Sequence, residues 1–552
     1  MTRSPLKRFD VPSSWSAGIL KALVAIALLA HASLTIRGRE KLADYPLADD
    51  PFYSFAVARH VALGQGITID GTTATNGFQP LFTFATVPFF WLAGEDRYAP
   101  LRYVWILEFA LCAATAFLLG HIGRDLLPRE DQQRRTTVFL TVALLYLGSA
   151  DILLEHYNGL ETGCLLFFLA LVWRVYQLGS EGSGTLWALG AILGLVVLTR
   201  VDAVFLVIVI AAHRLLKRGA GGWLRRLREA AILSGVPFLI SAPWWIYNYV
   251  YFGSLMPTSG QAETAWGLSW SKIRSTLWAF GEDGFPAAYT GRYKSIPTDF
   301  LQLLLGILVV WLAIRGFRRF GDPASRRTRR GLAFGGYLLL SCAILAAWYA
   351  LSSWAIHFYP RYLAPLLLLS TLAFGWMCVT LHETRRWIVL LIGAGLAAEV
   401  VVICAALETK WIFLGNVWHD QQLPLVQRSV PTGELVAAGQ SGALGYFRDR
   451  VVNVDGKVNA KALRFQDTMW NYLDAEGVRW FCDWESYVFQ YLGKKPEEHG
   501  WKLAGTSGRF FLYRRDVDRS AGAPPGPARA APTGAPPPPD RAAVGAGGGV
   551  PE

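Results

Sequence analysis

The sequence predicts a mainly α-helical protein that crosses a membrane many times and carries a small α/β domain outside the membrane. Of its 552 residues, 53% are hydrophobic and only 17% are charged, against roughly 25% charged in soluble domains. Apolar runs of helical length recur from residue 17 to residue 408. Too few charged residues remain to cover several soluble domains, and the apolar content excludes a wholly disordered chain. The bilayer is therefore the expected main solvent.

The apolar runs predict about eleven membrane spans. The run 185–213 counts as two short segments that meet near an interface, because Thr199-Arg200-Val201-Asp202 places charges in its middle. Residues 79–93 form a run of about 15, which fits a juxtamembrane or re-entrant helix better than a span. We expect the first run to be an uncleaved helix rather than a signal peptide. Apart from 185–213 and 79–93, the runs lie at 17–36 (the first run), 101–122, 136–153, 160–178, 231–252, 299–315, 331–352, 361–381 and 387–408.

Basic residues set the expected orientation. The segments 1–16, 123–135, 214–229, 315–330 and 382–386 together hold 22 Lys and Arg residues, and they all fall on the cytoplasmic side if the N-terminus is cytoplasmic. The net charge of +12 is then explained by the positive-inside rule, so no nucleic-acid partner is expected. The loops 37–100 and 253–298 carry mixed charge and lie outside.

Three domains follow from this pattern. Residues 1–408 form the transmembrane domain, with juxtamembrane helices in its outer loop 37–100. Residues 409–518 form an extracytoplasmic α/β domain, and the Pro/Ala/Gly-rich residues 519–552 cannot bury a core and are expected to be disordered. Within the α/β domain we expect strands at 434–439, 450–455, 478–483 and 509–514 and a helix at 459–476.

The first dense polar signal is the outer loop after the first span. Two adjacent carboxylates at a membrane interface are costly unless they are hydrated, paired or metal-bound. A helix that starts at Pro51 would place them at its N-terminus, so simple helix capping is the alternative to a catalytic role. The candidate residues of this loop are Asp49, Asp50, Tyr53, Arg59, Asn76 and Gln79.

Two further outer signals contain carboxylates, and one of them also contains an arginine. Glu161 follows Asn158-Gly159-Leu160 and sits on the first turn of a helix, where capping is the simpler interpretation. Arg200 and Asp202 interrupt the apolar run 185–213. They are either site residues or a buried ion pair that holds two half-helices together.

Two basic signals complete the outer face. Lys272 follows the Gly/Pro/Ser-rich segment 252–260, where a solvated loop charge is the simpler interpretation. Arg361 and Tyr362 open a helix at its outer end, although arginine gathers mainly at cytoplasmic ends; the alternative here is interfacial snorkelling.

Together these residues suit a phosphate-bearing lipid at the interface. Carboxylates act as bases toward hydroxyl groups, and guanidinium groups match phosphate geometry. No P-loop and no G-x-G-x-x-G after a strand occurs, which disfavours nucleotide-sugar chemistry. The nine His residues are scattered without metal-ligand spacing. No metal site is therefore assigned.

At these residues the chain resembles the GT-C superfamily of integral membrane glycosyltransferases. Relatives include the protein O-mannosyltransferases and the lipid A aminoarabinose transferases, and the chain looks closest to bacterial mannosyltransferase-like members. The resemblance covers about residues 15–410 and, more loosely, the outer domain at 442–447 and 453–456. The motifs that carry it are Asp49-Asp50-Pro51-Phe52-Tyr53, Thr75-Asn76-Gly77-Phe78-Gln79-Pro80-Leu81, Asn158-Gly159-Leu160-Glu161-Thr162, Thr199-Arg200-Val201-Asp202 and Arg361-Tyr362-Leu363.

The resemblance implies inverting transfer from a polyprenyl-phosphate sugar to an acceptor hydroxyl at the outer face of the bacterial plasma (inner) membrane. Asp49 is then the expected general base, with Tyr53 in the aromatic position. Asp50 would orient the base, bind acceptor, or hold the divalent metal that some relatives use. Where relatives often have His this chain has Gln79, which hydrogen-bonds but cannot titrate. The acceptor, a glycan, lipid or protein, is not indicated.

Three other functions remain open at this stage. A lipid-linked glycan transporter or flippase would need polar residues through the membrane midplane. A polysaccharide polymerase or ligase that uses lipid-diphosphate glycans would share the groove and the basic residues. A receptor or scaffold anchored by helices needs far fewer than eleven spans.

Overall fold

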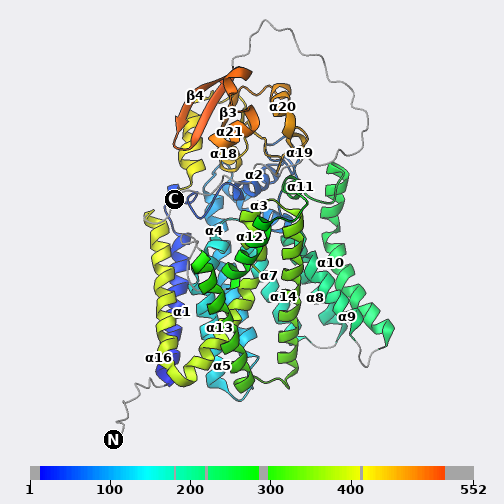
Figure 1. Ribbon diagram of the computed structural model, residues 1–552, viewed down its shortest axis with the longest axis vertical. Helices are drawn as coiled ribbons and strands as arrows, with labels where there is room; N and C mark the ends of the chain where they lie inside the picture. The colour runs from blue at the N-terminus through cyan, green and yellow to red at the C-terminus, as the bar shows by residue number, and fades with distance from the viewer. Residues whose placement is uncertain (1–12, 180–181, 218–221, 285–295, 411–414, 516–552) are drawn as a thin grey trace.

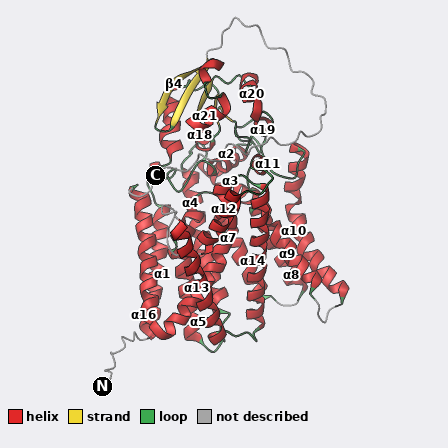
Figure 2. Cartoon of the chain, in the orientation of Figure 1, coloured by secondary structure: helices red, strands yellow, loops and turns green. Residues whose placement is uncertain are grey.

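A bundle of long helices with a smaller domain at one end makes up the molecule (Figure 1). The computed structural model describes residues 13–179, 182–217, 222–284, 296–410 and 415–515. Helices dominate the bundle, and the strands lie in the C-terminal domain (Figure 2). The expected architecture, a mainly α polytopic protein with a small α/β domain, is confirmed.

The helices of the bundle coincide with the apolar runs. A helix satisfies its backbone hydrogen bonds internally, which is what an apolar segment requires in a medium without water. The bundle helices are α1 (Ser13–Thr35), α4 (Ala99–Arg124), α5 (Gln132–Gly148), α6 (Ala150–Tyr157), α7 (Thr162–Leu178), α8 (Ser183–Thr199), α9 (Val204–Leu216), α10 (Trp223–Phe252), α13 (Ile296–Phe320), α14 (Arg326–Ser352) and α16 (Leu366–Thr409).

Not every bundle helix is long enough to cross a bilayer alone. Within the described ranges, six helical segments are long and apolar enough, or seven if the bent pair α5–α6 is one span. Helices α7 and α8 have 17 residues each and α9 has 13. At 1.5 Å per residue they reach about 25 Å or less, short of the roughly 30 Å hydrocarbon core. The eleven spans expected from the sequence therefore include helices shorter than a full span.

Two breaks in the helices were expected from the charges. Helix α8 ends at Thr199, Arg200 is extended (φ −146°), and the 3₁₀ turn η2 (Val201–Ala203) leads into α9. This confirms the interruption predicted within 185–213. Helix α16 is bent where Arg385 leaves helical geometry (φ −149°, ψ 65°). Its two arms correspond to the runs 361–381 and 387–408.

Short helices form a layer between the bundle and the C-terminal domain (Figure 1). Helix α2 begins at Pro51, as expected, because proline at the first helical position loses no needed N–H group. Helix α3 has 14 residues, which matches the short helix predicted at 79–93. The members of the layer are η1 (Arg39–Lys41), α2 (Pro51–Ala62), α3 (Pro80–Ala93), α11 (Thr258–Ala262), α12 (Trp270–Gly284), η3 (Ile356–Phe358) and α15 (Tyr359–Leu363).

The C-terminal domain is built on one five-stranded sheet with the order β2-β1-β3-β5-β4. Strand β1 pairs in parallel with β2 and β3, whereas β5 is antiparallel to β3 and β4. The strands are β1 (Val436–Ala438), β2 (Val451–Asn453), β3 (Trp480–Trp484), β4 (Trp501–Ser507) and β5 (Phe510–Arg515). The helices are η4 (Trp418–Gln422), α17 (Leu423–Ser429), α18 (Gly442–Phe447), α19 (Ala460–Leu463), η5 (Gln466–Thr468), α20 (Met469–Ala475), α21 (Glu485–Leu492) and η6 (Pro496–His499).

Two expectations for this domain were wrong in detail. The single helix expected at 459–476 is divided into α19 and α20 by the turn η5, and Asn459 caps α19 by accepting two backbone N–H groups. Strand β4 was not expected at all, because most of its residues are not buried and its register shifts between Leu503 and Gly505. The disorder expected for 519–552 lies outside the described residues.

Helix α18 holds the C-terminal domain on the layer below. The Tyr446 ring lies 5.3 Å from Phe52 and 6.3 Å from Phe55 of α2, measured between ring centroids. All three side chains are fully buried and belong to the same hydrophobic core as the bundle. The domain is therefore packed on the bundle rather than tethered, which fixes the N-terminal end of α18 above Asp49.

Candidate active site

A buried ion-pair network forms where α8 and α9 meet. The Arg200 guanidinium donates to both carboxylate oxygens of Asp202, at 3.2 and 2.5 Å, and to Glu161 Oε1 at 2.7 Å. Only 3% of Arg200 is exposed. Glu161 makes no side-chain capping bond to α7, so its role is this ion pair. The interpretation of Arg200 and Asp202 as a buried pair that joins two half-helices is thus what the structure shows.

Two stacked tyrosines extend the network toward the C-terminal domain. The Tyr349 hydroxyl donates to Asp202 at 2.7 Å, and its ring stacks on Tyr362 with centroids 4.2 Å apart. The Tyr362 hydroxyl donates to Glu263 Oε2 at 2.8 Å. Glu263 in turn lies 3.4 Å from the ammonium group of Lys457. A residue of the C-terminal domain therefore ends this chain of contacts.

Lys457 brings the network to the aspartate pair. Its Nζ atom lies 3.9 Å from Asp50 Oδ1. Burial alone would lower the pKa of Lys457, but the carboxylates of Asp50 and Glu263 outweigh it and hold the pKa above its usual range. Lys457 is therefore a permanent positive charge beside Asp50.

Arg361 is the third cation of the site. It lies in the short helix α15, which precedes α16, and its guanidinium is 5.6 Å from the centroid of the Tyr362 ring. It lies within electrostatic reach of Glu161, Arg200 and Asp50. Arg361 and Asp50 therefore share one face of the fold, as the sequence-based site requires.

Asp49 points to the C-terminal domain. Its two carboxylate oxygens accept backbone N–H groups from Gly442 at 2.9 Å and Ala443 at 2.7 Å. The Tyr53 hydroxyl lies 3.3 Å from the same carboxylate. Asp49 is 2% exposed. The chain thus covers this carboxylate with the first residues of α18 rather than using it to cap α2.

Burial perturbs three carboxyl groups at this junction. It raises the pKa of Asp49 to about 7, although the N–H groups of Ala443 and Gly442 act in the opposite direction. It also raises the pKa of Asp483 to about 7 and that of Asp455 to about 6. A carboxyl group whose pKa is near the working pH can act as a proton acceptor and donor.

These shifts predict that the three carboxyl groups contribute most to stability in mild acid. A carboxyl group with a raised pKa binds more protons folded than unfolded, so stability falls as pH rises from about 4 to about 7. Each such group changes the unfolding free energy by up to ~1.4 kcal/mol per pH unit. At pH 8 these groups should lower the unfolding temperature of the purified protein relative to pH 5. Asp483→Asn should reduce this difference, whereas the exposed Asp467→Asn should not; equal slopes in both variants would contradict the assignment.

The Thr75–Leu81 motif positions Lys457. Asn76 is fully buried and accepts from the backbone N–H and the hydroxyl of Thr258, at 3.0 and 2.9 Å. The Thr258 hydroxyl also lies 2.9 Å from the Lys457 carbonyl. A Cβ atom on Gly77 would lie 1.9 Å from that same carbonyl oxygen. Glycine is therefore required at 77 for the Lys457 loop to approach.

Three other predicted residues also hold the site together. Gln79 accepts the backbone N–H of Val201 at 3.4 Å, beside the α8–α9 break. The Tyr53 hydroxyl accepts the N–H of Ser441 at 3.2 Å. Arg59 reaches Asp449 of the C-terminal domain at 3.8 Å. Their contacts link the loop, the break and the upper domain.

Lys272 lies apart from this network. Its ammonium group donates to the carbonyls of Ala265 and Gly267, both at 2.7 Å. Burial lowers its pKa. Lys272 thus closes its own loop, and the structure does not bring it to the other basic residues.

Sequence reasoning missed Lys457, Glu263 and Tyr349. Glu263 and Lys457 lie 194 residues apart and meet only because α11 approaches the C-terminal domain. The segment Asn453–Gly456, which is part of the family resemblance, could have indicated Lys457, because Lys457 follows it directly.

The described residues contain one group that could be read as a metal site. Asp44, His419 and Asp420 offer ligand atoms within 4.8 Å of one another. However, the Lys410 ammonium lies 3.0 Å from Asp44 and 3.4 Å from Asp420. Lys410 therefore pairs with both carboxylates, and no contact that the structure describes joins this group to the network around Asp50.

Comparison with known proteins identifies the fold. No family model and no curated protein sequence matches the chain. ArnT from Cupriavidus metallidurans in the apo state is similar at a TM-score of 0.56 and 14% identity, over 90% of this chain and 97% of that chain.

An oligosaccharyltransferase from Archaeoglobus fulgidus, solved with Zn and sulfate, has a TM-score of 0.51 at 12% identity, over 89% of this chain and 73% of that chain. AglB from the same organism, in complex with an inhibitory peptide and a dolichol-phosphate, has a TM-score of 0.50 at 10% identity, over 94% of this chain and 76% of that chain.

These comparisons show a polytopic membrane protein with the GT-C fold. The solved structures that it resembles have this fold, and the similarity spans most of the chain. The fold class implied by the motifs is therefore confirmed. Function depends on the site rather than on the fold.

Proposed function

We propose that the protein is a glycosyltransferase that moves a monosaccharide from a polyprenyl-phosphate donor to an acceptor hydroxyl. The observation that carries this proposal is the clustering of Arg361, Arg200 and Lys457 with the Asp49–Asp50 pair, between the bundle and the C-terminal domain. The fold is shared with a protein solved with a dolichol-phosphate, which supports a lipid-phosphate donor.

Arg361 and Lys457 are the proposed phosphate ligands. Arg200 already donates to two carboxylates, so its part is to position α8, α9 and the tyrosine stack. A guanidinium and an ammonium group that face the departing phosphate stabilise the charge that develops there. The apolar bundle beneath them would hold the prenyl tail.

Asp49 is the proposed general base. The bond between the sugar C1 and the phosphate oxygen breaks, and the lipid phosphate leaves with the electron pair. The acceptor oxygen bonds to C1 from the opposite side, which inverts the configuration, and its proton passes to Asp49. The leaving phosphate is a weak base and needs no general acid. Asp50, beside Lys457, would orient the acceptor.

The arrangement of Asp49 adds a condition to this reaction. In the structure, the backbone N–H groups of Gly442 and Ala443 donate to the two oxygens of this carboxylate. An acceptor hydroxyl reaches the base only after the start of α18 withdraws. The covered state keeps water from Asp49 when no acceptor is present.

The proposed setting is the bacterial plasma membrane, with a cytoplasmic N-terminus and an extracytoplasmic C-terminal domain. The 22 basic residues assigned to the cytoplasmic segments support this orientation. The partners are the bilayer, the lipid-linked donor, and a glycan, lipid or protein acceptor. No step is assigned to a metal.

Lipid-phosphate binding tests the proposal. Polyprenyl phosphate alone should bind the purified protein, and Arg361→Gln should weaken that binding at least tenfold, because hydrogen bonds to charged groups contribute about 1.5–3 kcal/mol. Arg274→Gln removes an exposed arginine from α12 near the same face and serves as the control. Equal affinities of Arg361→Gln and the wild type, measured by native mass spectrometry, would remove Arg361 from the site.

A further inference from the structure

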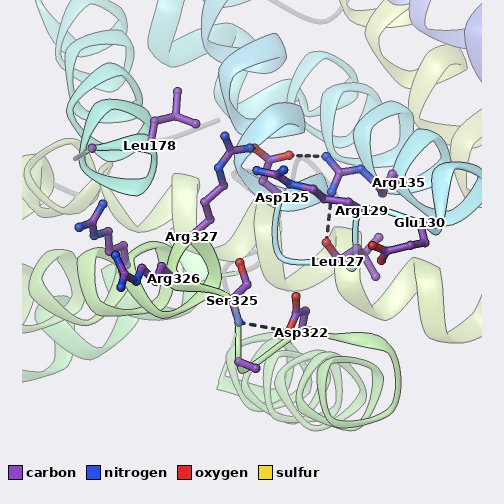
Figure 3. A pocket seen from close by; sticks show the side chains of 13 residues that line it. Asp125, Leu127, Arg129, Glu130, Arg135, Leu178, Asp322, Ser325, Arg326 and Arg327 are labelled. Atoms are coloured by element: carbon purple, nitrogen blue, oxygen red, sulfur yellow. Dashed lines mark hydrogen bonds and ion pairs between the residues drawn. The ribbon is translucent and has the colours of Figure 1, made fainter. Parts of the chain in front are cut away.

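A polar cavity lies at the end of the bundle opposite the C-terminal domain. It has a volume of about 680 Å³. Its walls are the loop after α4, the C-terminal end of α7 and the turn before α14 (Figure 3). The leucines Leu127 and Leu178 line it beside charged groups. The cavity is unrelated to the chemistry of the site above, which lies at the other end of the helices.

One carboxylate in this cavity faces four arginines. Asp125 is 4% exposed, and its oxygens lie 2.5 Å from Arg135, 2.9 Å from Arg174, 3.4 Å from Arg327 and 3.5 Å from Arg124. Figure 3 shows Arg135 and Arg327 converging on Asp125. One negative charge cannot neutralise four guanidinium groups, so this cluster alone carries excess positive charge.

The rest of the lining increases the excess. Three more arginines, Arg129, Arg326 and Arg330, line the cavity, and the described lining adds the carboxylates Glu130 and Asp322. One oxygen of Asp322 accepts the N–H of Ser325 at 3.1 Å. Among the described residues, five arginines therefore line the cavity against three carboxylates, and Arg124 and Arg174, which contact Asp125 from outside the lining, add two more guanidinium groups.

Such a concentration of arginines at a membrane face requires anions. Guanidinium groups bind phosphate with two parallel hydrogen bonds. The volume lies within the range of about 300–1,000 Å³ of ordinary ligand sites. Basic pockets between membrane helices on the cytoplasmic side suit anionic lipid head groups, and the leucines offer a surface for the start of an acyl chain. We propose that this cavity binds the phosphate head group of an anionic phospholipid from the leaflet opposite the C-terminal domain.

Arg326→Gln/Arg330→Gln is the informative variant. Both arginines line the cavity, and neither forms an ion pair with a residue that the structure describes, so the fold should persist. The matched control is Arg228→Gln/Arg318→Gln, which removes two exposed arginines from α10 and α13 outside the cavity.

The experiment is a titration of the purified full-length chain in detergent, followed by native mass spectrometry. Phosphatidylglycerol should bind at least tenfold more tightly than phosphatidylcholine. The cavity variant should lose at least tenfold in affinity for phosphatidylglycerol, and the control variant should bind as the wild type does.

Three results would overturn the proposal. If the cavity variant retains wild-type affinity, the cavity is not the site. The control variant could lose as much affinity as the cavity variant, which would indicate bulk charge. Inorganic phosphate or glycerol 3-phosphate could displace phosphatidylglycerol at equal concentration, which would indicate a site for a free anion.

Discussion

Asp49→Asn should lower the rate of sugar transfer by about 10²–10⁴-fold, the usual contribution of a general base. Asparagine has nearly the same shape, but it cannot take the acceptor proton. Binding of polyprenyl phosphate should change little, since Arg361 and Lys457 remain. Turnover and lipid binding, measured on the same purified protein, separate these two effects.

The pH profile adds a second readout for Asp49. Burial raises the pKa of this carboxyl group to about 7, so the fraction that can accept a proton grows as pH rises through that value. The kcat/KM of the wild type, which reports the free enzyme with Asp49 covered, should therefore rise about tenfold per unit below pH 7 and level off above it. The residual activity of Asp49→Asn should lack this rise.

Two comparisons make the Asp49 result interpretable. Glu95→Gln changes an exposed carboxylate of the same outer loop and should leave transfer unchanged. Asp50→Asn removes the carboxylate that faces Lys457 at 3.9 Å. Near-normal turnover of Asp49→Asn would refute its role as base, and if Asp50→Asn alone abolished transfer, the base would be Asp50.

Gly442→Ala should loosen the C-terminal domain from the bundle. A Cβ atom at 442 would lie 2.1 Å from the carbonyl oxygen of Asp49, and backbone cannot yield as a flexible side chain can. The start of α18 must then move, and both N–H bonds to Asp49 are lost. We expect a fall in unfolding temperature of several degrees and faster proteolysis at the domain junction.

Gly445→Ala is the matched control for this change. It alters the same short helix, but the nearest atom to the new Cβ is Val451 Cβ at 3.8 Å, an ordinary contact. Alanine also favours helix over glycine by about 1 kcal/mol. Gly445→Ala should therefore leave stability and transfer at or above wild-type values. Equal behaviour of the two variants would show that Asp49 does not hold the domain.

The membrane architecture could be predicted because its signals are local. Charges cost so much in hydrocarbon that Arg200 and Asp202 mark the break between α8 and α9 by themselves. The start of α2 at Pro51 likewise depends on one residue. Strand β4 could not be found in this way, because an exposed edge strand needs no strict alternation of apolar residues.

The site was predicted in part, for a physical reason. The motifs identified the segments that meet, including Asp50, Arg200 and Arg361. They could not show that Asn76 and Gly77 position the Lys457 loop. The contact between Gly77 and Lys457 joins residues some 380 positions apart and depends on the packing of two domains. Nor could they show that α18 covers Asp49. Local patterns report a residue's chemistry, whereas its partner depends on the tertiary fold.

The most direct test of the central claim is sugar transfer itself. The purified protein would be supplied with a panel of radiolabelled polyprenyl-phosphate monosaccharides and an extract of cell-envelope acceptors, beside lipid-diphosphate glycans as the competing donors. We predict that label moves from at least one polyprenyl-phosphate sugar to an acceptor, that polyprenyl phosphate is released, and that Asp49→Asn fails to do this. Consumption of the lipid-diphosphate glycans alone, with every polyprenyl-phosphate sugar left intact, would contradict the account.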